Sequence, residues 1–73
     1  MKRRYNIEVD CANCANKIED RINRMDEVDS CNINFMMMKM IVTLKDNVNE
    51  DGFLEKANQV ARRVDSDSKI SKK

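Results

Sequence analysis

Apolar and polar residues alternate along the first part of the chain and then change period. Tyr5–Val9 alternates apolar with polar side chains, the period of a half-buried strand. From Cys14 the apolar residues recur at helical spacing as far as Met25. Asp26-Glu27 then ends this stripe. The pattern therefore predicts a strand followed directly by an amphipathic helix.

The second part of the chain repeats this order. Cys31–Phe35 and Met38–Leu44 alternate again and predict two more strands, joined without the Asn-Gly or Gly signal of a tight hairpin. A second helical stripe runs roughly from Glu50 to Arg63, with acidic residues at its start and basic residues at its end. Asp65–Ile70 is a candidate for a short last edge strand, and Ser71–Lys73 is expected to be a frayed basic tail.

The order strand, helix, strand, strand, helix, strand gives two similar halves. With right-handed crossovers, such halves close as a split βαβ sandwich. We therefore expect an α+β fold of the ferredoxin-like βαββαβ type, a four-stranded antiparallel sheet with both helices on one face. The length of the chain predicts a single domain over residues 1–73, which we expect to be ordered over about residues 3–70.

Composition narrows the possible functions. The net charge is +1, with the two signs interspersed, and one Tyr, two Phe and no Trp leave little for stacking bases. The sequence therefore argues against a nucleic-acid partner. It contains no His, which excludes imidazole catalysis and zinc sites of the Cys/His type. We expect no membrane span, because no apolar run approaches the ~20 residues that one needs.

Two of the three cysteines carry the question of function. Cys11 and Cys14 lie where the first strand passes into the first helix, so their sulfurs can converge on one ion. The free N–H groups at a helix N-terminus favour thiolate, the form that binds metal. Asp10 places a carboxylate beside them as a possible third ligand. An open metal site with two or three protein ligands suits an ion that is passed onward.

The cysteine pair also has three alternative interpretations. A structural zinc site needs four ligands, and the chain has neither His nor a second Cys-x-x-Cys to complete one. A dithiol redox module would also place the pair at a helix N-terminus, but the chain is short for that fold and has no Pro to line such a site. The two residues are also compatible with incidental core cysteines.

The residues around the pair resemble a known family. Ile7–Ala15, followed by Lys17-Ile18-Glu19, resembles the heavy-metal-associated domain, and Val28 and Ile33-Asn34-Phe35 fall where that family has apolar positions. The resemblance implies the same βαββαβ fold. It also implies kinship with small metallochaperones and with the cytosolic N-terminal domains of metal-exporting P-type ATPases.

The resemblance also bears on the metal. Copper members of the family typically carry Met-x-Cys-x-x-Cys with Thr or a similar residue before the first Cys. Here Val9 occupies the Met position and Asp10 precedes Cys11, which is similar to the zinc, cadmium and lead exporters. Two soft thiolates satisfy Cu(I), whereas a divalent ion gains from an anionic oxygen ligand. We therefore expect Cys11, Cys14 and Asp10 to bind Zn²⁺, Cd²⁺ or Pb²⁺, with a Cu⁺ carrier that uses the two cysteines alone as the alternative.

The remaining candidate residues favour structural roles. Cys31 is expected in the core or at an edge, and the methionines of Met36–Met38 and Met40 are expected to fill the core or cover a turn rather than bind copper. Glu50-Asp51 suits a helix start. Arg62-Arg63 suits a solvated helix end, near enough to the cysteines to contact an acidic partner.

These observations predict a cytoplasmic metal-transfer module that is not itself an enzyme. Its expected partners are the metal ion and either the membrane-spanning body of a pump or a metal-donating or metal-accepting protein. The chain has no ATP-handling motif, so any pump activity would reside elsewhere. We expect neither nucleic-acid binding nor direct membrane insertion.

Overall fold

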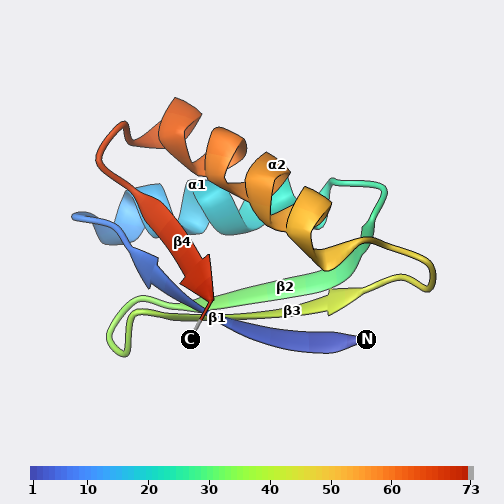
Figure 1. The fold of residues 1–73 in the computed structure, drawn as a ribbon. Coiled ribbons are helices and arrows are strands. Elements are labelled where there is room, and N and C mark those ends of the chain that lie inside the picture. The colour runs from blue at the N-terminus through green and yellow to red at the C-terminus, as the bar shows by residue number, and fades with distance from the viewer. Residues whose placement is uncertain (73) are drawn as a thin grey trace.

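The computed structural model describes residues 1–72 and confirms the predicted order of elements (Figure 1). The elements are β1 (Lys2–Glu8), α1 (Ala12–Asn23), β2 (Val28–Asn34), β3 (Lys39–Leu44), α2 (Glu50–Val64) and β4 (Lys69–Lys72). The strands form one antiparallel-paired sheet in the order β2-β3-β1-β4, and both helices pack on the same face of it. This is the expected ferredoxin-like fold.

The core lies between the helices and the sheet because only one face of each strand is apolar. Alternate residues of β1 and β3 point into it, and Ile18 and Ile22 of α1 and Phe53 of α2 close it from the other side. Ala57 and Ala61 of α2 are fully buried. Their small side chains let this helix lie close against its neighbours. Neither helix in the described chain is long and apolar enough to cross a membrane.

Several predicted boundaries were wrong by a few residues. β1 begins at Lys2 rather than Tyr5, because Lys2 and its neighbours pair with β3 although their side chains show no apolar alternation. By contrast, α1 begins at Ala12, directly after Cys11, where the sequence places the passage from strand to helix, and its apolar stripe starts two residues later. β2 begins at Val28, which is buried; an irregular register between Val28 and Ser30 hides the alternation there.

The turn between β2 and β3 and the last strand also differ from expectation. Met38 adopts a left-handed backbone, with φ of 55°, where Gly or Asn is usual, so its residue type does not signal a turn. The last strand is Lys69–Lys72 rather than Asp65–Ile70, and Ser71 and Lys72 therefore belong to the sheet instead of a frayed tail. Lys73 lies outside the described residues.

Each helix holds the edge strand that follows it through one asparagine. The Asn23 side chain in α1 donates to the Cys31 carbonyl at 3.0 Å and accepts from the Cys31 N–H at 2.8 Å. Asn58 in α2 makes the same pair of bonds with Ile70 of β4, at 2.9 and 2.8 Å. Glu19 adds a bond from the Ile33 N–H at 2.6 Å. We call these contacts the edge clamps; they satisfy backbone groups that no neighbouring strand could reach.

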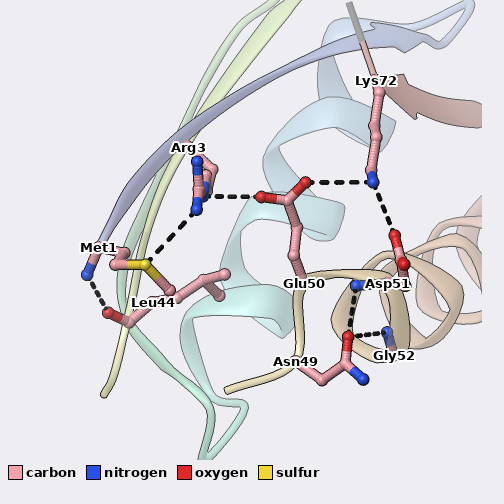
Figure 2. Close-up of polar contacts among 8 residues, drawn as sticks. All are labelled: Met1, Arg3, Leu44, Asn49, Glu50, Asp51, Gly52 and Lys72. Carbon is pink, nitrogen blue, oxygen red and sulfur yellow. Dashed lines mark hydrogen bonds and ion pairs between the residues drawn. The ribbon is translucent and has the colours of Figure 1, made fainter. Parts of the chain in front are cut away.

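Charged side chains join the start of α2 to β1 and β4 (Figure 2). Glu50 pairs with Arg3 at 2.7 Å and with Lys72 at 3.3 Å, and Lys72 also reaches Asp51 at 2.6 Å. The Asn49 side chain caps the helix by accepting from the Asp51 N–H at 3.0 Å. These groups are partly exposed, so each pair contributes little to stability. Together they connect the start of α2 to both strands.

The Tyr5 side chain brings a polar hydroxyl group into the apolar core. Its ring packs on Phe53 with centroids 6.2 Å apart, and the side chain is 2% exposed. The buried hydroxyl has no hydrogen-bond partner within residues 1–72, and burial raises the pKa of Tyr5. A buried hydroxyl without a partner carries a desolvation cost.

Replacing Tyr5 by Phe should therefore leave the free energy of unfolding unchanged or raise it by up to roughly 1 kcal/mol, because the ring contacts stay and the unpaired hydroxyl is removed. Chemical denaturation of both proteins measures the difference. A clear loss of stability in Tyr5→Phe would show that the hydroxyl has a partner.

The clamp on β4 gives a second prediction. Asn58→Ala leaves the Ile70 N–H and C=O without their partner and should lower the free energy of unfolding by roughly 1–3 kcal/mol. Gln59→Ala, an exposed amide on the same helix, is the matched control and should change it by less than about 0.5 kcal/mol. Equal effects of the two substitutions in denaturant titrations would contradict the clamp.

Candidate metal centre

The two cysteines of the motif lie in the turn between β1 and α1, and buried residues fix both ends of this turn. Val9 is 4% exposed and Ala15 is 2% exposed. Between them, Cys11 takes an extended backbone as the N-cap residue, and its carbonyl accepts from the Ala15 N–H at 3.0 Å. Cys11 is exposed and Cys14 is partly buried in the first helical turn. The structure thus brings both thiols together at the surface.

The turn gives the two thiols opposite tendencies. Although Cys11 forms no regular side-chain cap within residues 1–72, the backbone N–H groups of Cys14 and Asn13 favour its anion and lower the pKa of the Cys11 thiol. Burial raises the pKa of Cys14, and the hydrogen bond that its thiol shares with the Cys11 sulfur raises it further. The pair is therefore disposed to hold one thiolate and one thiol that share a proton.

The third predicted ligand, Asp10, is exposed beside the pair. Its carboxylate lies with those of Asp65 and Asp67, and the three offer oxygen atoms within 4.8 Å of one another. Within the described chain, the two sulfurs do not join Asp10 in a group of that size. We call these three residues the aspartate group.

Sequence reasoning missed Asp65 and Asp67. Asp65 is the C-cap residue of α2 and Asp67 follows in the connection to β4. The negative charge of Asp65 opposes ionisation of both thiols and so acts to raise both pKa values. This effect is smaller than that of the backbone N–H groups at Cys11 and smaller than that of burial at Cys14. The signal was available: in a βαββαβ fold the end of the second helix returns to the end of the sheet where the first strand finishes (Figure 1).

The β2–β3 hairpin reaches the same end of the molecule (Figure 1). The Ile7 N–H donates to the Met38 carbonyl at 3.0 Å and ties the hairpin to β1. Met36 and Met37 are 93% and 66% exposed, whereas Met40 is fully buried in the core. Met40 therefore fills the core as expected, and the two exposed residues cover the turn.

The remaining residues singled out in the sequence have structural positions. Cys31 is a core residue in the middle of β2, and burial raises the pKa of its thiol to about 12. Glu50-Asp51 forms the first turn of α2, as expected, and Arg62-Arg63 is exposed in its last turn. The Cys31 thiol is thus buried and disfavoured as a thiolate, and the thiols that a metal ion can reach are those of Cys11 and Cys14.

Comparison with known proteins agrees with this geometry. The sequence profile of the heavy-metal-associated domain matches residues 4–66. A search of curated proteins gave no significant match. Among solved structures, the chain is similar to the N-terminal domain of a potential copper-translocating P-type ATPase from Bacillus subtilis, with 26% identity and a TM-score of 0.76, covering 99% of this chain and 85% of that one.

More distant structures share the fold. The yeast copper transporter domain Ccc2a has a TM-score of 0.70 at 15% identity and covers 96% of this chain and 90% of its own. The N-terminal domain of PacS from Synechocystis has a TM-score of 0.67 at 21% identity, covering 96% and 92%. Since the family profile spans most of the sequence and includes the turn with Cys11 and Cys14, the chain belongs to the heavy-metal-associated domain family.

Proposed function

We propose that this metal-binding domain takes up and passes on a soft divalent ion, Zn²⁺, Cd²⁺ or Pb²⁺, through Cys11, Cys14 and a carboxylate of the aspartate group. The exposed thiol of Cys11 and the half-buried thiol of Cys14 in a preformed turn support transfer rather than permanent storage, because an incoming ligand can reach the ion. The observation that carries the divalent assignment is the gathering of three carboxylates within 4.8 Å of one another, one of which, Asp65, acts electrostatically on both thiols.

The charges explain why a divalent ion suits this place. Three carboxylates within 4.8 Å repel one another, and a cation between them and the thiols relieves that repulsion. Two thiolates already neutralise Cu⁺ with an excess of one negative charge, so further carboxylates hinder that ion. A divalent ion accommodates two thiolates and gains from a hard oxygen ligand. Asp10 is the first candidate because it directly precedes Cys11, and Asp65 is the second.

A Cu⁺ carrier that uses Cys11 and Cys14 alone is the second candidate. The names of several structural relatives refer to copper, among them the Bacillus subtilis and yeast domains. These names describe those proteins, and the residue before the first cysteine is the point at which this chain can differ. The dithiol redox module is a third candidate. A protein that binds no metal and catalyses disulfide exchange would favour it.

We place the domain in the cytoplasm, as the metal-binding domain of a metal-transporting P-type ATPase or as a free metallochaperone. Its partners would be the metal ion and either the pump body or a metal-donating or metal-accepting protein. The family and the ATPase domains among its structural relatives support this setting. We assign no catalytic step to the domain itself.

The choice between the ions depends on Asp10. Asp10→Ala should weaken Zn²⁺ and Cd²⁺ binding by roughly ten- to a hundredfold, as expected for loss of an anionic ligand, and should change Cu⁺ affinity little. Competition titrations with chelators of known affinity measure each ion. Asp65→Asn, tested in parallel, shows whether the second carboxylate supplies the oxygen instead.

Matched variants separate a ligand from a general charge effect. Asp46→Asn removes one exposed negative charge in the β3–α2 connection and should change no affinity. Cys11→Ser and Cys14→Ser should abolish tight binding of every ion, whereas Cys31→Ser should not. Equal losses of Zn²⁺ and Cu⁺ affinity in Asp10→Ala, with Asp65→Asn silent, would overturn the divalent assignment.

The thiol pKa shifts give a pH-dependent prediction. Thiolate is the form that iodoacetamide alkylates, so a lowered pKa keeps Cys11 reactive at lower pH, and a raised pKa moves the onset for Cys14 to higher pH. Cys31, with a pKa of about 12, should stay unmodified in the folded protein. Peptide mapping by mass spectrometry across a pH series measures the three sites separately.

Urea-unfolded protein is the control for these rates. In it, the three cysteines should react with similar pH profiles, because the fold that separates their pKa values is gone. Zn²⁺ added to the folded protein should protect Cys11 and Cys14. Reaction of Cys14 at lower pH than Cys11 would contradict the assignment of Cys11 as the first thiolate.

A further inference from the structure

The sheet has a second face, opposite the one that the helices cover (Figure 1). Strand alternation places on it the residues of the four strands that do not point into the core. Its charged members on β1, β3 and β4 are the cationic Lys2, Arg4, Lys39 and Lys69 and the acidic Glu8, and the exposed Asp29 lies at the irregular start of β2. We call it the bare face. It concentrates positive charge although the whole chain is nearly neutral.

A hollow of about 410 Å³ lies on the bare face. Arg4, Asn6, Asn32, Asn34, Lys39 and Ile41 line it, and Met37 from the hairpin turn forms one wall. Ile41 is half-buried and Met37 is 66% exposed, so the hollow combines an apolar surface with cationic and amide groups. The hollow can therefore offer a ligand both apolar contact and polar partners.

The cations of the hollow have no acidic partners in the described chain. Arg3, one residue earlier on the opposite face, pairs with Glu50 (Figure 2). By contrast, no carboxylate within residues 1–72 forms an ion pair with Arg4 or Lys39, and the Lys39 ammonium donates to the Asn6 side-chain oxygen. Arg4 and Lys39 are therefore free to pair with carboxylates of a ligand.

The sheet register sets the spacing that such a ligand must match. Arg4 is paired with Ile41, and Lys39 lies two residues from Ile41 on the same strand, so Arg4 and Lys39 are diagonal neighbours. Such neighbours are separated by about 7–8 Å. In an extended chain, alternate residues on one side are roughly 7 Å apart. Carboxylates at alternate positions of an extended segment therefore fit these two cations, with an aliphatic residue further along reaching Met37.

Aromatic side chains decide between an acidic protein segment and a nucleic acid. Tyr5 is also among the residues that line the hollow, but its ring packs on Phe53 in the core and the residue is only 2% exposed. The hollow thus offers cations and aliphatic surface without the stacking platform that single-stranded nucleic acid requires. An acidic protein segment uses both kinds of group.

We propose that the bare face is a docking surface for an extended acidic segment of a partner protein, with carboxylates at alternate positions on Arg4 and Lys39 and an aliphatic side chain against Met37. This interaction does not depend on metal in the turn. Exposed ion pairs and a small hollow give weak binding, with a Kd on the order of 0.1–1 mM that rises with salt.

The test is a titration of the ¹⁵N-labelled full chain with the acetylated, amidated peptide Glu-Ser-Glu-Ser-Leu-Ser, followed by NMR. We expect the largest amide shifts on β1 and β3 beside the hollow, at Arg4, Asn6, Lys39 and Ile41. Arg4→Gln/Lys39→Gln should raise the Kd about fivefold or more. Lys17→Gln/Arg21→Gln removes the same charge from the exposed surface of α1 and should leave the Kd unchanged.

Several results would overturn the proposal. The first is that the peptide causes no saturable amide shifts, and the second is that the shifts lie on the helices instead of the sheet. The third is that both double variants raise the Kd of the peptide equally. Equal binding of a peptide with Ser in place of both Glu residues would remove the carboxylate assignment. Tighter binding of oligo-dT at the same amides would replace the acidic segment by nucleic acid, and concentration-dependent shifts without peptide would replace it by a second copy of the chain. Spectra of each variant alone verify that it is folded.

Discussion

Both helices must pack on the same face of the sheet, because the strands are apolar on one side only. The right-handed crossovers that achieve this packing bring the start of α1, the β2–β3 hairpin and the α2–β4 connection to one end of the molecule. The metal centre follows from that arrangement. Cys11 and Cys14 reach the surface there because Val9 and Ala15, on either side of them, are held in the core.

Periodicity was enough to predict the architecture, because each half of the chain buries one stripe of each element. It failed where a residue's role depends on a distant partner. Arg3 is part of a strand because it pairs with β3 and with Glu50, and neither contact leaves an apolar pattern. Lys72 is similar, since it pairs with β1 and with Glu50 and Asp51. Met38 holds a left-handed turn conformation that its residue type does not signal.

The candidate site shows the same division. The cysteine pair was visible in sequence because its spacing is local. The aspartate group joins Asp10 to residues more than fifty positions away, so only the folded chain assembles it. The β1–α1 turn holds the two thiols and Asp10, and the end of α2 with its connection to β4 adds Asp65 and Asp67. Residues outside the thiol motif thus contribute to the charge around it.

The edge clamps have a consequence for the behaviour of the protein in a crowded solution. A sheet with two open edges is a template on which other chains can assemble as added strands and, ultimately, as aggregates. Here Asn23 and Asn58 occupy the outward backbone groups of Cys31 and Ile70, and Glu19 takes that of Ile33. Growth of the sheet would first have to displace these side chains. A chain without proline can thereby keep its strands from recruiting one another.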